Sequence, residues 1–153
     1  LFAGNGSLAA YKERVAQDRQ KRVCFFGPVA NEAIPDFYRA ADIYCLCSRM
    51  EGWPISLLEA LYNGLPGVVS DLPAFREKLQ DNVHCLKFPV EDTARLTEKM
   101  LALIPDAEKR RQLGRAAVEQ YQKELDTASA FDRIAAIYKH ILEPKRRNRC
   151  QGP

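Results

Sequence analysis

The chain has 153 residues, of which 46% are hydrophobic and 28% are charged. This composition is typical of one ordinary globular domain with its own core, and no apolar run approaches the ~20 residues that span a bilayer. The formal net charge of +3 is too small to indicate nucleic-acid binding, so we expect no nucleic-acid partner.

Short apolar runs alternate with helical stretches along most of the chain. The runs end in turn residues and lack strict alternation, which is typical of strands buried on both faces. They cover residues 1–3, 23–26, 43–47, 67–69 and 84–88, and the helical stretches between them cover 7–20, 31–41, 54–63 and 73–80. The alternation predicts an α/β fold, a doubly wound (Rossmann-like) parallel sheet with helices on both faces.

Capping residues mark several helix ends. Asn31 is expected to cap the second helix, while Pro54 at the first position and Gly64 just past the end bracket the third. After the last strand we expect C-terminal helices from about Asp92 to residue 104 and over about 106–124, and a last amphipathic helix capped by Thr127.

Residues 1–142 are therefore expected to form one domain, followed by a basic tail over 143–153. The first apolar run begins at Leu1, so we expect an N-terminally truncated part of a longer protein, with further strands ahead of it. The tail gathers Lys145, Arg146, Arg147 and Arg149. It is either a solvated end or a surface attracted to anionic lipid, so peripheral contact with the inner face of a membrane stays open.

Five cysteines, an odd number, fit no complete disulfide framework. Four of them lie within the apolar runs and none forms a CxxC pair, so we expect structural core thiols and no zinc site. They are Cys24, Cys45, Cys47, Cys85 and Cys150. Free thiols imply a reducing compartment, and with no signal-peptide pattern at the start we expect a cytoplasmic protein.

Gly4-Asn5-Gly6 follows the first strand and opens a helix. This is the context of a phosphate-cradling loop, but the third glycine of the dinucleotide motif is absent. A tight strand-to-helix turn explains the same residues, and the sequence leaves both interpretations open.

The segment from Ser48 to Ala60 is the most informative. It leaves a strand, turns at Gly52 and enters a helix at Pro54. Ligands of parallel sheets bind beyond the carboxyl ends of the strands, and a helix N-terminus offers N–H groups and a positive dipole end that suit a diphosphate. Gly52 would allow the backbone to approach a ligand closely.

Two glutamates flank this helix start, Glu51 on the loop and Glu59 in the second turn. Ser56, Glu59 and Asn63 form one polar stripe on an otherwise apolar helix. The stripe is either a solvent face or the wall of a cleft. In a cleft, the two acceptor oxygens of Glu59 would suit two vicinal hydroxyls.

The ordered set of features resembles the C-terminal, donor-binding domain of family 4 glycosyltransferases, which are retaining enzymes of the GT-B fold. The resemblance runs from residue 1 to about residue 142. Glu51 and Glu59 match the E-x7-E signature of that family. The other matching segments are 23–29, 37–43, Ser48, Gly52, Ala60, 64–66 and 68–71.

The resemblance implies a role for each site residue. Glu51 would contact hydroxyls of the donor sugar in the catalytic centre, and Glu59 would bind the nucleotide ribose. The backbone after the first glutamate would meet the donor's phosphate or sugar, and the turn after the second strand would lie near the base. The donor-binding positions after the first glutamate are Gly52, Trp53, Ile55 and Ser56. Those in the turn near the base are Gly27 and Val29.

The resemblance also implies the partners. The substrate would be a UDP-, GDP- or ADP-sugar, with no metal ion and no other cofactor, because helix N-termini and basic side chains stabilise the leaving diphosphate. The acceptor, a sugar or glycolipid in polysaccharide, lipopolysaccharide or glycolipid synthesis, would bind mainly through an N-terminal lobe. The diphosphate-binding Arg and Lys would also precede Leu1, so we expect no transfer by this part alone.

The chain departs from the family pattern at three positions. Pro54 replaces a frequent glycine and lacks an N–H donor. Gly67 stands where a β-branched residue is usual, and Cys85 where a glycine is usual. Two other classes stay open: another GT-B enzyme, such as an epimerase or a phosphorylase, and a non-catalytic α/β binding module.

Overall fold

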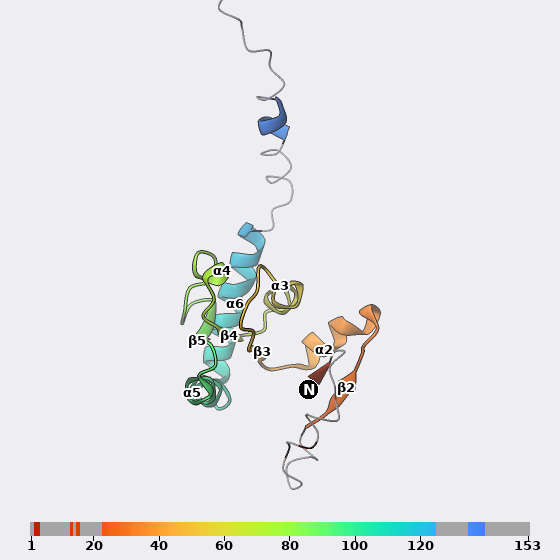
Figure 1. The fold of residues 1–153 in the computed structure, drawn as a ribbon, viewed down its shortest axis with the longest axis vertical. Coiled ribbons are helices and arrows are strands. Elements are labelled where there is room, and N and C mark those ends of the chain that lie inside the picture. The colour runs from red at the N-terminus through yellow and green to blue at the C-terminus, as the bar shows by residue number, and fades with distance from the viewer. Residues whose placement is uncertain (1, 4–12, 14, 16–22, 125–134, 140–153) are drawn as a thin grey trace, which may run out of the picture.

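A computed structural model of the chain describes residues 2–3, 13, 15, 23–124 and 135–139 (Figure 1). The described strands form two parallel sheets. One pairs β1 (Phe2–Ala3) with β2 (Phe25–Gly27), and the other has the order β3 (Tyr44–Leu46), β4 (Gly67–Ser70), β5 (Cys85–Phe88). The helical elements are η2 (Asn31–Ala33), α2 (Ile34–Ala40), α3 (Ile55–Tyr62), α4 (Pro73–Arg76), α5 (Thr93–Leu103) and α6 (Ala107–Glu124).

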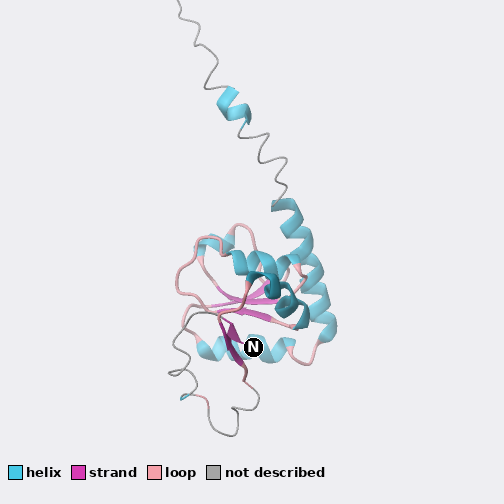
Figure 2. Cartoon of the chain, turned by 90° about the vertical axis from the view of Figure 1, so that its right-hand side faces the viewer, coloured by secondary structure: helices cyan, strands magenta, loops and turns pink. Residues whose placement is uncertain are grey.

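Helices cover both faces of the three-stranded sheet (Figure 2). Side chains alternate between the faces of a strand, so Val69 and Cys85 pack with α3 and α4 while Val68 and Leu86 pack on the α5 side. Helix α6 packs against the core on both sides of the sheet. Its Ala117 belongs to the cluster with Val69 and Cys85, and its Leu113 belongs to the cluster with Val68 and Leu86. The predicted α/β fold with a parallel sheet between helices is confirmed.

The described strands do not join into one sheet as expected. In the Rossmann order 3-2-1-4-5-6, strand 1 separates strand 2 from strand 4. The orders β2-β1 and β3-β4-β5 correspond to 3-2 and 4-5-6 of that series. A strand preceding β1 would fill the remaining place, and this preceding strand stays a prediction.

The helix ends follow the capping rules with two exceptions. The Asp92 side chain accepts a hydrogen bond from the backbone N–H of Arg95 at 2.9 Å and caps α5, as predicted. Asn31 does not cap, because the first turn is a 3-10 helix preceded by Ala30 with no side-chain cap bond. Pro54 precedes α3 as its N-cap instead of occupying its first position. Thr127 lies outside the described residues.

Helix α3 ends in a Schellman motif around Gly64. The N–H groups of Gly64 and Leu65 donate to the carbonyls of Leu61 and Ala60, both at 3.0 Å. Gly64 has φ +69°, the left-handed conformation that glycine adopts without a Cβ penalty. The turn delivers the chain directly into β4, as the sequence predicted.

Two of the departures from the family pattern lie side by side in the sheet. Gly67 and Cys85 are direct partners across β4 and β5. A Cβ on Gly67 would lie 3.4 Å from Val69 Cγ1 and 3.6 Å from the Cβ of Cys85. Both distances are ordinary van der Waals contacts, so a Cβ at position 67 would pack against these two neighbours without a clash.

The cysteines correct one expectation. Cys85 is fully buried, but Cys24, Cys45 and Cys47 are exposed. Cys150 and the basic tail lie outside the described residues, as do Gly4-Asn5-Gly6 and most of the expected first and last helices. Within the described part of the chain, no helix has the length and apolarity needed to cross a membrane.

Candidate functional site

The candidate site lies where the chain leaves β3 and enters α3, at the carboxyl end of a parallel strand. The N–H groups of Leu57 and Leu58 both donate to the carbonyl of Pro54, at 3.1 and 3.3 Å. The N–H groups of Ile55 and Ser56 come before these bonds, and neither has a partner among the described residues. The first turn of α3 therefore presents two backbone donors at its positive end.

Glu51 is half-buried on the loop before this helix. The Ser48 hydroxyl donates a hydrogen bond to Glu51 Oε1 at 2.7 Å, and this bond orients the carboxylate from within the same loop. Gly52 follows, exposed, and a Cβ placed there would meet no atom within 4 Å. The space beside Gly52 is therefore open among the described residues, and its use by a ligand stays a prediction.

Glu59 is half-buried one turn into α3 and faces α2 instead of solvent. The Tyr38 hydroxyl lies 3.0 Å from Glu59 Oε2 and 3.1 Å from the Ser56 carbonyl oxygen. The Ser56 hydroxyl bonds the Tyr44 hydroxyl at 2.8 Å. The solvent-face interpretation of the polar stripe is therefore wrong for Ser56 and Glu59. It holds for Asn63, which is exposed and bonds the Glu59 carbonyl.

Both carboxylates act on the same phenol. Burial raises the pKa of Tyr44; the Ser56 hydrogen bond opposes this, and the negative charges of Glu51 and Glu59 raise it further. The pKa of Tyr38 is raised by burial first and then by its bond to Glu59. Both phenols thus stay protonated at neutral pH.

Trp53 anchors the loop to the neighbouring element α4. Its ring lies 5.8 Å from the ring of Phe75 in an edge-on arrangement, and the Lys78 ammonium lies 5.5 Å from its centroid. These contacts fix the backbone between Glu51 and the helix start. The backbone contact of Trp53 with the donor stays a prediction; its ring supplies packing that holds the loop.

Gly27 and Val29 lie at the end of β2 and just beyond it. Gly27 is buried with φ +68°, and Val29 is half-buried. No described contact joins either residue directly to Glu51 or Glu59. The connection runs through α2, which follows them in the chain and supplies Tyr38.

The structure adds Ser48, Tyr38 and Tyr44 to the predicted residues. Ser48 stands three positions before Glu51, so a local spacing could have suggested it. Tyr38 is 21 positions from Glu59, and only the tertiary fold brings the two together. Among the described residues, no group of three or more His, Cys, Asp and Glu side chains could hold a metal ion; the expectation that no metal is needed stays a prediction.

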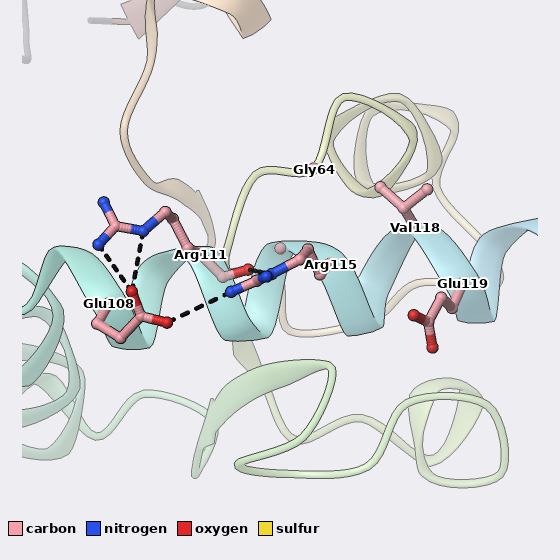
Figure 3. Close-up of a pocket in the computed structure, with 7 residues that line it drawn as sticks. Gly64, Glu108, Arg111, Arg115, Val118 and Glu119 are labelled. Atoms are coloured by element: carbon pink, nitrogen blue, oxygen red, sulfur yellow. Dashed lines mark hydrogen bonds and ion pairs between the residues drawn. The ribbon is translucent and has the colours of Figure 1, made fainter.

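A separate open pocket of about 750 Å³ lies between the turn at Gly64 and α6 (Figure 3). Glu108 pairs there with Arg111 at 2.7 Å and with Arg115 at 3.3 Å. The pocket is at the far end of α3 from the helix start, and it shares no residue with the candidate site.

Two curated relatives align with most of the chain. The phosphatidyl-myo-inositol mannosyltransferase of Mycobacterium leprae is 30% identical over 142 residues, which cover 92% of this chain and 37% of the relative. The lipopolysaccharide core biosynthesis mannosyltransferase LpsB of Rhizobium meliloti is 28% identical over 134 residues, which cover 86% of this chain and 38% of the relative. The chain thus spans well under half the length of these relatives.

The fold is also similar to that of solved glycosyltransferases. The crystal structure of Anabaena Alr3699/HepE in complex with UDP-glucose superposes with a TM-score of 0.73 at 21% identity, over 90% of this chain and 40% of that one. The family model for glycosyl transferases group 1 matches residues 1–120. Since that match covers the strands, α3 and both glutamates, the chain belongs to the glycosyl transferases group 1 family.

Proposed function

We propose that the chain is the C-terminal, donor-binding domain of a retaining glycosyltransferase that binds a nucleotide-diphosphate sugar. One observation carries the proposal. Glu51 and Glu59 flank the start of α3, where the Ile55 and Ser56 N–H groups have no described partner. The arrangement sets two acceptors for sugar hydroxyls on either side of two donors for an anion.

Each part of the donor has a proposed place. Glu51 accepts hydroxyls of the transferred sugar, and Glu59 accepts the hydroxyls of the ribose. The N–H groups at the start of α3, with the backbone at Gly52 and Trp53, face the diphosphate and stabilise the charge that develops as it leaves. Gly27 and Val29 lie near the base, on the side of Glu59 from which α2 approaches.

The relatives support this class of substrate and suggest the acceptor. Alr3699/HepE was crystallised with UDP-glucose, and the two curated relatives are mannosyltransferases of lipopolysaccharide and of phosphatidyl-myo-inositol. We infer a UDP-, GDP- or ADP-sugar as donor and a sugar or glycolipid as acceptor. Contact of the basic tail with a membrane surface belongs to the same proposal.

The domain would act together with a second lobe. The chain covers 37% and 38% of its two relatives, and the described part of the proposed site consists of carboxylate acceptors and backbone N–H groups. We propose that the diphosphate-binding cations and the acceptor site come from an N-terminal lobe, so residues 1–153 alone would not transfer sugar.

Activity of the full-length protein tests the proposal. It is measured with UDP-, GDP- and ADP-sugars in the wild type and in Glu51→Gln and Glu59→Gln. Each variant loses one charge-assisted acceptor, so we expect kcat/KM to fall by roughly 10- to 100-fold, with an unchanged circular dichroism spectrum. Glu77→Gln is the matched control, because Glu77 is exposed at the C-terminal end of α4 and has no predicted role in the site.

The outcomes separate the alternatives. Full activity in both variants would support a non-catalytic role for this domain and would contradict the proposal. Inversion of the anomeric configuration in the product, read by NMR, would contradict retaining transfer. An epimerised nucleotide sugar in place of a glycoside would identify another GT-B enzyme.

A further inference from the structure

The carboxylate of Glu59 is oriented from another element of the fold. Tyr38 belongs to α2 and Glu59 to α3, 21 positions apart, and the phenol hydroxyl lies 3.0 Å from Glu59 Oε2. Both side chains are half-buried. A carboxylate on an exposed helix turn rotates between several rotamers, whereas this one has a fixed donor on one oxygen.

Tyr38 is itself held from several sides. Its single hydroxyl hydrogen faces two acceptors, Glu59 Oε2 and the Ser56 carbonyl oxygen at 3.1 Å. Its ring lies 6.3 Å from the ring of Tyr44 at an angle of 49°, and Tyr44 is bonded in turn to the Ser56 hydroxyl. The phenol therefore cannot swing away without breaking contacts with β3 and α3.

The hydrogen bond from Tyr38 makes the two carboxylate oxygens of Glu59 different from each other. Oε2 accepts from Tyr38, while Oε1 has no partner among the described residues. A vicinal diol needs an acceptor at a fixed place. Because the tyrosine fixes one oxygen, it also fixes the direction of the other.

We infer that Tyr38 is a positioning residue for ribose recognition, which aims the free oxygen of Glu59 at the ribose hydroxyls of the nucleotide. This inference rests on the proposed function. Tyr38 touches no substrate in this assignment and acts only through Glu59. The same residue connects the ribose contact to α2, the helix that follows Gly27 and Val29.

Calorimetric titration of the full-length protein with UDP, GDP and ADP tests the inference, followed by the 2′,3′-dideoxy form of each nucleotide that binds. Tyr38→Phe keeps the ring and removes the hydroxyl. We expect its Kd for the ribonucleotide to rise about tenfold, the size of one charge-assisted hydrogen bond, and its Kd for the dideoxy form to stay unchanged. In the Glu59→Gln background, Tyr38→Phe should cause no further loss.

The control is Tyr62→Phe, which removes a hydroxyl from an exposed tyrosine at the other end of α3. Equal weakening of the ribo and dideoxy forms by Tyr38→Phe would show a merely structural role and overturn the inference. So would unchanged binding in Tyr38→Phe while Glu59→Gln weakens it. Failure of the wild type to bind any of the three nucleotides would instead overturn the proposed function.

Discussion

Replacing Gly114 by alanine would drive a methyl group into the backbone of the turn between α3 and β4. Gly114 is buried in α6, and a Cβ built on it would lie 2.1 Å from the carbonyl oxygen of Gly64 and 3.1 Å from its carbonyl carbon. The obstacle is main chain and cannot rotate away. Helix α6, which runs beside α3 in Figure 1, would have to move by about 1 Å.

Two effects of this substitution oppose each other. Helix propensity alone favours alanine over glycine in a helix interior by roughly 1 kcal/mol. Overpacking costs about 1–3 kcal/mol or more, and a gap of 0.5–1 Å forfeits a quarter to a half of each nearby contact. Those contacts include Ala117 and Leu113, which are buried in the two core clusters. We expect the steric cost to win, with a net loss of about 1–3 kcal/mol.

Urea unfolding of the 153-residue chain measures the change, with Gly52→Ala as the control. A Cβ at Gly52 meets nothing within 4 Å, so its free energy of unfolding should stay within about 0.5 kcal/mol of the wild type. A Gly114→Ala protein as stable as the wild type, or more stable, would refute the close approach of α6 to the α3–β4 turn.

Two further predictions concern the loop and the pH dependence. Ser48→Ala removes the 2.7 Å hydrogen bond to Glu51. In the full-length protein we therefore expect kcat/KM for the nucleotide sugar to fall about tenfold, while the Kd of the free nucleotide stays unchanged. An equal loss of nucleotide binding would contradict a sugar-specific role. Burial, and then the charges of Lys123 and Lys87, lower the pKa of His84 from 6.5. The unfolded chain is thus protonated first, and stability should be lost as pH falls through about 6.5. Urea unfolding at several pH values should show a shallower loss in His84→Gln, and an identical slope would count against a neutral, half-buried imidazole in the folded chain.

The fold was predictable where local signals specify it. Asp92 caps the start of α5 and Gly64 follows the end of α3, as the sequence indicates, because capping depends on neighbours within a turn. The exposure of Cys45 and Cys47 was not predictable from their apolar run. It depends on which strand lies beside β3, and strand order is a property of distant segments. Among the cysteines that the structure describes, Cys85 alone has the predicted burial.

The candidate site divides in the same way. Glu51 and Glu59 were found from the order of motifs around them, and the structure places both beside the start of α3. Periodicity alone could not decide whether the stripe at Ser56 and Glu59 faced solvent, since a helix has the same period on either side. The decision comes from Tyr38, whose contact with Glu59 exists only in the folded chain.

The two carboxylates therefore depend on the fold to different degrees. Glu51 is held by Ser48, three positions away on the same loop, so its orientation survives any movement that leaves the loop intact. Glu59 is held by Tyr38 of α2, so its orientation requires α2 to stay docked on α3. A displacement of β2 and α2 would weaken the binding of the ribose before it affected the binding of the sugar. Under the proposed function, nucleotide binding therefore depends on the packing of α2 against α3, whereas binding of the donor sugar depends on the loop before α3.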